Sequence, residues 1–294
     1  MARKKTLELG VINITMSAPH LPERYVELFR EAFTLNIKTE LRGDYIGILG
    51  ELKIEDDFDG SKLVRGDFFK YMELDATKEW FSVQKRKRAD KEDLDTISIP
   101  DDLKPHFQFF PFVFFPKGHR LVLICRDSKE SLPPKQAAEI LSTIFNCSSI
   151  QDKFGRIDVV IEPSRETLDK IFSSPRLRTL EIEVTPPNAD DFHEFEEDVY
   201  KNMDSQNTRS YHITLQEADE RGLSPSERTK KLAQIAQSNG KVVGHIGSRG
   251  KNKILSTQDH PLIDKVDYLP DTQIRSEVLF SKAIELINNL KFKK

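Results

Sequence analysis

Residues that could do acid–base chemistry gather in the segment 240–261, which reads GKVVGHIGSRGKNKILSTQDHP. An imidazole can deprotonate a 2′-hydroxyl, and a guanidinium can stabilise the phosphorane that follows. His245, Arg249 and His260 are therefore candidate catalytic residues of a metal-independent endoribonuclease. The spacing of the histidines and Asp259 matches no known ligand pattern, so the sequence predicts neither a metal nor a cofactor here.

The same segment also carries enough positive charge to contact phosphates. The candidate nucleic-acid-binding residues are Lys241, Arg249, Lys251 and Lys253. Lysine and arginine hold the nucleic-acid backbone without reading its sequence, and glycine-rich backbone can approach phosphates closely. A β-hairpin with strands at 241–246 and 253–257 and a polar turn between them explains the same residues without either function.

A second group of residues resembles part of a metal-dependent nuclease site. Asp44 precedes Glu51-Leu52-Lys53, and in such nucleases two carboxylates hold Mg²⁺ while a lysine orients water. All of these residues fall on a single predicted strand, too close for the usual two-strand arrangement. The sequence also lacks a phosphate loop, a dinucleotide fingerprint, a nucleophile elbow and a zinc-peptidase helix.

The elements that must position these residues can be read from apolar periodicity. Strands are expected at 7–16, 45–54, 63–74, 107–115, 121–126, 156–162 and 177–185. Helices are expected from Pro22, at 133–146, 165–173, 188–206 and 275–291, and from Ser224, which would cap its helix. This order predicts an α+β fold: a mixed or antiparallel sheet with ferredoxin-like βαββ elements and helices on one face, plus a smaller helix-rich C-terminal α+β region.

Pro186-Pro187 interrupts the strand pattern and is the expected domain boundary. It separates an N-terminal α+β domain, 1–186, from a C-terminal helical region with the β-hairpin, 187–294. The chain of 294 residues is long enough for one large or two modest domains.

Three further stretches favour structural roles. The run of phenylalanines in 107–115 has aromatic side chains on both faces and no basic residue, which is typical of a buried strand rather than a base-stacking surface. The charge-dense connector 85–98 is expected to be a solvated loop. The two Arg-Gly-Asp tripeptides suggest that Arg42 or Arg65 pairs with nearby carboxylates, although two such arginines could also bind an anion.

Composition limits the setting and the partners. The 45 basic and 48 acidic residues give a formal charge of −3, so nucleic acid would have to bind a local patch. The 2 cysteines lie in apolar surroundings and indicate neither a disulfide framework nor zinc. Without an apolar leader or a membrane-spanning run, a cytoplasmic protein is expected.

Several stretches together resemble the bacterial family called domain of unknown function 4747. They are VINITMSAPHLPERYVELFREAF, LRGDYIGILGEL, FPFVFFPKGHRLVLICRDS, VVIEPSRETLDKIFSSPRLRTLEIEVTPPNADD and NGKVVGHIGSRGKNKILSTQDHPL. The resemblance covers nearly the full chain. It implies a bacterial intracellular protein and an association with mobile-element and phage-defence genes, but no reaction and no catalytic residue.

These observations leave three functional hypotheses. The first is a nucleic-acid-binding protein, with RNA favoured, whose hairpin contacts phosphates in a mobile-element or phage-defence system. The second is a protein-interaction subunit of a defence or toxin complex. The third is a metal-independent endoribonuclease toxin that uses His245 and His260. The sequence leaves open whether the protein is an enzyme and what its oligomeric state is.

Overall fold

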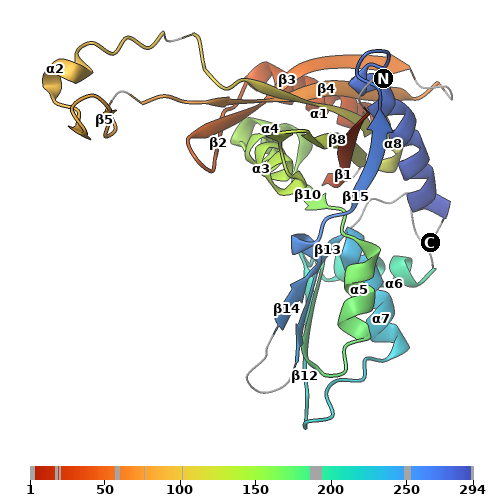
Figure 1. The fold of residues 1–294 in the computed structure, drawn as a ribbon. Coiled ribbons are helices and arrows are strands. Elements are labelled where there is room, and N and C mark those ends of the chain that lie inside the picture. The colour runs from red at the N-terminus through yellow and green to blue at the C-terminus, as the bar shows by residue number, and fades with distance from the viewer. Residues whose placement is uncertain are drawn as a thin grey trace.

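The computed structural model describes residues 4–16, 19, 21–56, 60–75, 77–100, 102–185, 194–247 and 253–292. A large and a small antiparallel sheet lie one below the other and carry helices on their faces (Figure 1). The helices are α1 (Pro22–Leu35), α2 (Lys91–Leu94), α3 (Pro134–Phe145), α4 (Ser148–Phe154), α5 (Arg165–Phe172), α6 (Glu194–Ser205), α7 (Glu227–Ser238) and α8 (Arg275–Phe292). The predicted α+β class with an antiparallel sheet is confirmed.

The large sheet has the strand order β10-β1-β8-β7-β4-β3-β2, while β15 pairs with β1 and β9 pairs with β8. Its strands are β1 (Lys5–Met16), β2 (Thr39–Leu41), β3 (Tyr45–Asp56), β4 (Lys62–Met72), β7 (Gln108–Phe115), β8 (Arg120–Asp127), β9 (Glu130–Ser131), β10 (Ile157–Ile161) and β15 (Ile263–Tyr268). The predicted strand–helix–strand–strand unit corresponds to β1-α1-β3-β4, and the short strand β2 was not predicted. Within the sheet, β8 and β7 lie between β1 and β4.

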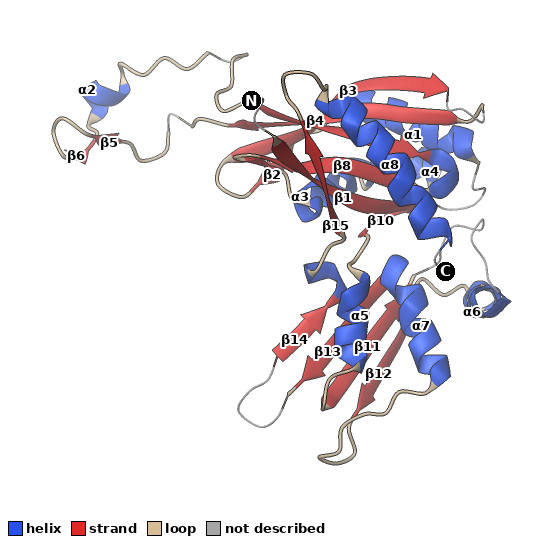
Figure 2. Cartoon of the chain, turned by 45° about the vertical axis from the view of Figure 1, so that its right-hand side comes forward, coloured by secondary structure: helices blue, strands red, loops and turns tan. Residues whose placement is uncertain are grey.

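Alternation along β7 explains how this sheet is buried on both faces. Phe110, Phe112 and Phe114 lie on one face in a core that includes residues of α1, α3 and α4, and the ring of Phe29 on α1 lies 4.8 Å from that of Phe114. Val113 points to the opposite face, where α8 crosses the sheet (Figure 2). The aromatic run therefore forms a buried strand as predicted over 110–115, and α8 adds a helical layer to the face that the sequence left bare.

The small sheet has the order β12-β11-β13-β14. Its strands are β11 (Leu177–Val184), β12 (Tyr211–Gln216), β13 (Gly240–Ile246) and β14 (Lys253–Ser256). Leu180, Ile182 and Val242 face a core shared with α5 and α7, which lie across one side of this sheet (Figure 2). The opposite side carries polar side chains of the same strands, and no described helix covers it.

A buried polar cluster joins the two sheets. Arg120 Nε lies 3.0 Å from Glu162 Oε2, and both side chains are almost fully buried. Asn13 accepts a hydrogen bond from Arg120 and donates through Nδ2 to the carbonyl oxygen of Ser238 at 3.0 Å. Because Asn13 and Arg120 belong to the large sheet and Ser238 ends α7, this cluster ties the small sheet and its helices to the large sheet.

The chain passes between the sheets more than once. After β14 it returns to the large sheet, where β15 pairs with β1 from Lys5↔Tyr268 to Gly10↔Ile263. The predicted boundary after residue 186 lies outside the described residues, between β11 and β12, which are hydrogen-bonded neighbours. The division into 1–186 and 187–294 stays a prediction. None of the described helices is both long enough and apolar enough to cross a membrane.

Candidate functional site

The C-terminal hairpin has the strands that the sequence predicts. Residue pairing runs from Val243↔Ser256 to Ile246↔Lys253, and β13 also pairs with β11. A Cβ on Gly244 would lie 2.7 Å from the side chain of Ile171, so α5 packs directly on the backbone of this strand. Gly244 thus faces the helices, and its neighbours Val243 and His245 face the open side of the sheet.

Carboxylates flank the predicted site residues on that open side. His245 Nε2 lies 3.4 Å from Glu181 Oε1, and Lys241 lies opposite Glu183 in the register of β11 and β13. On β12, His212 Nε2 lies 3.8 Å from the same Glu183. The centre of the open face is therefore acidic, which disfavours a phosphate there.

The end of the hairpin has a different charge. Lys253 is exposed at the first position of β14, and within the described part of the chain neither Lys253 nor Lys241 forms an ion pair with a carboxylate. Arg249 and Lys251 lie outside the described residues. A phosphate contact at this end therefore stays a prediction, with Lys253 as the cation that the structure locates.

The two candidate catalytic histidines lie apart. His245 lies opposite Ile254 near the outer end of the hairpin. His260 follows a 3-10 turn at Thr257–Asp259, where its carbonyl oxygen accepts a hydrogen bond from Ser164 N at 2.8 Å beside the junction of the sheets. The structure thus does not bring together the acid and base that the ribonuclease hypothesis requires.

The group of carboxylates and a lysine that resembled a nuclease site includes Asp67, which was not predicted to belong to it. Asp44 lies in the turn before β3, outside the group, and pairs with Lys78. Glu51 and Lys53 on β3 instead share a cleft of about 270 Å³ with Asp67 on β4. The pairing of these strands shifts register between Leu49 and Leu52, which places this bulge opposite Asp67.

The electrostatics of the cleft suit structural pairing. Arg65 contacts Glu55 at 3.2 Å and Glu277 of α8 at 2.7 Å, which confirms the predicted arginine–carboxylate pairing. Burial and the neighbouring Glu51 raise the pKa of Asp67 above its ordinary value. In the described part of the chain, no group of three or more His, Cys, Asp or Glu side chains is placed to hold a metal ion.

A third feature is a long projection from the large sheet, which we call the arm: residues 73–106, between β4 and β7 (Figures 1 and 2). Its base is fastened to the body by polar contacts. Glu73 N donates to the Asp44 carbonyl oxygen at 2.8 Å, and Lys104 pairs with Glu73. The arm therefore starts from a defined position on the sheet.

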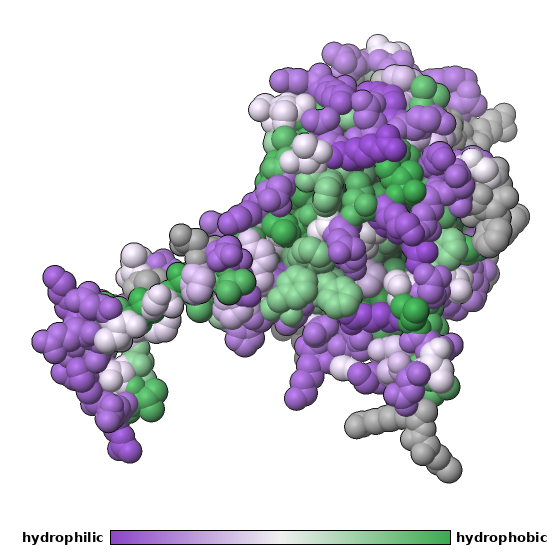
Figure 3. Space-filling model, turned by 90° about the horizontal axis from the view of Figure 1, so that it is seen from above, coloured by the Kyte–Doolittle hydropathy of each residue, from purple (hydrophilic) through white to green (hydrophobic). Residues whose placement is uncertain are grey.

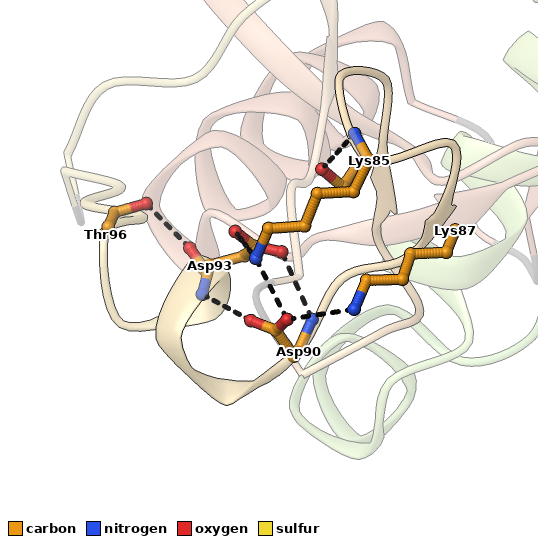
Figure 4. Close-up of polar contacts among 6 residues, drawn as sticks. Lys85, Lys87, Asp90, Asp93 and Thr96 are labelled. Carbon is orange, nitrogen blue, oxygen red and sulfur yellow. Dashed lines mark hydrogen bonds and ion pairs between the residues drawn. The ribbon is translucent and has the colours of Figure 1, made fainter.

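The outer part of the arm, residues 79–98, is called the tip. It contains the short strands β5 (Phe81–Ser82) and β6 (Lys87–Arg88) and the helix α2. Lys85 Nζ lies 2.9 Å from carboxylate oxygens of both Asp90 and Asp93, and these two residues form a reciprocal capping box (Figure 4). All hydrogen bonds and ion pairs of the described tip residues stay within the arm.

The tip has polar contacts but no core. No residue of α2 is buried, and Phe81 and Val83 are 64% and 78% exposed. Phe81 lies on β5 and Val83 lies in the turn that follows it, so the two exposed apolar side chains are close in the chain. An isolated two-stranded hairpin is only marginally stable in water, so this tip leaves apolar surface to be covered.

Aromatic side chains are also exposed where the arm joins the body. We call Phe69, Phe107 and Phe109 the aromatic patch: the Phe69 ring lies 5.1 Å from Phe107, and Phe107 stacks on Phe109 at 6.3 Å. Phe107 is 56% exposed. Figure 3 shows hydrophobic side chains in a recess with a hydrophilic rim, beside the start of the arm. The aromatic patch lies on the sheet face that α8 covers further along. This part of the face is open because α8 begins only at Arg275, whose guanidinium lies 4.1 Å from the Phe109 ring centroid.

Neither feature was predicted: the residue pattern indicated a solvated loop at 85–98 and a buried strand from residue 107. One signal was available: Trp80, Phe81 and Val83 precede the charged run and are apolar side chains in a segment with no predicted partner. The exposure of Phe107 and Phe109 depends on where α8 begins, which strand periodicity does not reveal.

Comparison with known proteins gives a family but no function. The family model described as "Domain of unknown function (DUF4747)" matches residues 5–285. No curated protein matches the chain. Among solved structures, the crystal structure of a PDZ domain protein from Parabacteroides distasonis ATCC 8503 aligns at 9% identity and a TM-score of 0.12, covering 90% of this chain and 73% of that one. A likeness at that TM-score carries no argument.

Proposed function

This chain belongs to the DUF4747 family, and we propose that it is a protein-interaction subunit that binds a protein partner through its arm. One observation carries the proposal: among the described residues, the tip has no core and no hydrogen bond or ion pair with the body, and it presents Phe81 and Val83 to solvent. Exposed apolar surface of this kind marks an interaction site.

The charge around the arm favours a protein over a nucleic acid. At the tip, Lys85 and Lys87 contact Asp90, and Arg88 lies 2.9 Å from Glu79. The acidic residues 90–95 follow directly. At the base, Asp67 and Glu51 lie beside the aromatic patch. Most cations of the tip are thus paired with carboxylates, and carboxylates also line the base, so neither end is a basic surface for phosphates. A protein, in contrast, can match apolar and charged groups together.

A second candidate function is nucleic-acid binding by the C-terminal hairpin. Its support is local: Lys253 is exposed at the outer end of the hairpin, and Arg249 and Lys251 precede it in the sequence. The acidic centre of the open sheet face would limit such binding to the hairpin end. RNA is the expected nucleic acid, and the affinity would fall steeply with salt.

The cellular setting belongs to the same proposal. A bacterial cytoplasmic protein of a mobile-element or phage-defence system is what the family resemblance suggests. An interaction subunit needs no catalytic group, which fits the separation of His245 from His260.

Site-specific photo-crosslinking in cells tests both candidates in one experiment. A photoreactive amino acid is placed at Val83 in the tip, at Lys253 in the hairpin, or at Thr143, an exposed control position on α3. We expect a discrete protein adduct from position 83 and none from position 143.

The type of adduct separates the hypotheses. An RNA adduct from position 253 would support the second function. Irradiation that yields no protein adduct at position 83, or the same adducts as the control position, would rule out the arm as the interaction site.

A further inference from the structure

The two ends of the arm carry matching surfaces. At the tip, Phe81 and Val83 are exposed beside Arg86, which forms no ion pair within the described chain. At the base, Phe107 and Phe109 are exposed beside Asp67 and Glu51. Each end therefore combines apolar surface with charge. The charge is positive beside the short strands β5 and β6 of the tip and negative at the base.

The carboxylates at the base are placed to meet an incoming cation. Asp67 precedes Phe69 by two residues on β4, so both side chains point to the same face of the sheet. Among the described residues, neither Asp67 nor Glu51 has an ion-pair partner. Arg65, which lines the same cleft, is paired with Glu55 and Glu277. Arg275 is paired with Asp127 at 3.0 Å.

We propose that the protein partner is a second copy of this chain, an inference that rests on the proposed function of the arm. Two arms would lie side by side in antiparallel directions, related by a two-fold axis. The tip of one subunit then covers the aromatic patch of the other, and the same contact occurs a second time in reverse. A two-fold interface requires self-complementary surfaces, and a single arm carries both halves of this contact.

The dimensions and the chemistry of the arm agree with this arrangement. In Figures 1 and 2 the tip lies at the far end of the arm, away from the sheet that carries the aromatic patch. The tip therefore does not cover the patch at its own base. Phe81 and Val83 would bury their side chains against Phe107 and Phe109 of the partner subunit, and Arg86 would approach Asp67 and Glu51 of the partner subunit. Aromatic and arginine side chains are common at the centre of protein interfaces.

Sedimentation of the purified full chain tests this dimer. We expect a concentration-dependent dimer that Phe81→Ser or Phe109→Ser weakens on the order of 100-fold, because each substitution occurs twice in a symmetric interface. The matched control is Ile254→Ser, since Ile254 is 61% exposed on the small sheet and lies away from the arm. Phe81 contributes to no core, so its substitution leaves the body folded, and circular dichroism would verify this.

A disulfide experiment tests the geometry of the contact. In a Cys147→Ser background, one protein carries Val83→Cys and another carries Phe107→Cys. Disulfides form only when the Cβ atoms come within about 4.5 Å. Oxidation of the mixture should give a covalent dimer, and a chain with both cysteines should give linked pairs rather than an internal disulfide.

Each result decides the inference. A chain that stays monomeric, or a dimer that Phe81→Ser and Phe109→Ser leave unchanged, overturns the second copy as partner. If the photo-crosslinker at position 83 then captures a different protein, the arm keeps its proposed function and only the partner is wrong. If it captures no protein at all, both proposals fall.

Discussion

At the scale of single residues, the polar cluster at the junction of the sheets links side chains that depend on one another for burial. Arg120 and Glu162 are withdrawn from water and neutralise each other at 3.0 Å, while Asn13 links them to the end of α7. A buried ion pair adds little net stability compared with apolar side chains, but one partner alone is costly to bury. Each charged side chain of the cluster therefore needs its partner to remain buried without a large cost in stability.

This dependence predicts the effect of Arg120→Met. The substitution should lower the free energy of unfolding by about 3–5 kcal/mol, because Glu162 stays buried without its cation. Urea unfolding would measure the loss. The matched control is the double variant Arg120→Met/Glu162→Leu, which removes both charges and should recover much of the stability. A double variant as unstable as the single variant would contradict this interpretation.

At the scale of elements, the small sheet depends on a close approach between β11 and β13. Gly240 begins β13 with a positive φ of 149°, opposite Val184 at the end of β11. A Cβ on this glycine would lie 1.9 Å from the carbonyl oxygen of Glu183. Any side chain at this position must therefore separate the strands.

The expected result is that Gly240→Ala destabilises the protein by more than about 3 kcal/mol. Gly60→Ala is the control: Gly60 also has a positive φ, of 77°, but a Cβ there would meet no atom within 4 Å. It should cost only about 1–2 kcal/mol for the backbone conformation. Thermal unfolding would compare the two variants. Equal losses of stability would show that the close approach of β11 and β13 does not determine the effect at Gly240.

Local elements could be predicted from the sequence because their signals are local. The helix expected at 275–291 is α8 at Arg275–Phe292, and the predicted hairpin strands are β13 and β14. The start of α7 was placed too early. Ser226, rather than Ser224, caps the helix, because its hydroxyl accepts a hydrogen bond from Thr229 N at 3.2 Å. Two serines around a proline offer alternative caps that only the structure separates.

The candidate sites were harder to predict because they depend on contacts between distant segments. Asp67 joins Glu51 only through the shifted register of β3 and β4, which neither strand's sequence reveals. His245 and His260 are close in sequence, yet they lie apart because the hairpin and the following turn separate them. Phe107 and Phe109 have a strand pattern, and their exposure depends on a helix that begins more than 150 residues later.

At the scale of the whole molecule, the arm is the feature that the rest of the fold does not require. The large sheet is covered by α1, α3 and α4 on one face and by α8 on the other, and β15 closes its edge beside β1. The tip adds nothing to these cores, and its polar contacts stay within the arm. We therefore infer that this projection, with its exposed apolar side chains, serves to bind a partner.

The most direct test replaces the tip, residues 79–98, with a short Gly-Ser linker and compares the native mass of the particle isolated from cells with that of the full chain. Since the tip makes no described hydrogen bond or ion pair with the body, thermal unfolding should change by less than about 2 °C. We predict that the full chain carries at least one further protein molecule and that the chain with the linker is a monomer. Equal masses for the two proteins would contradict the arm as the interaction site.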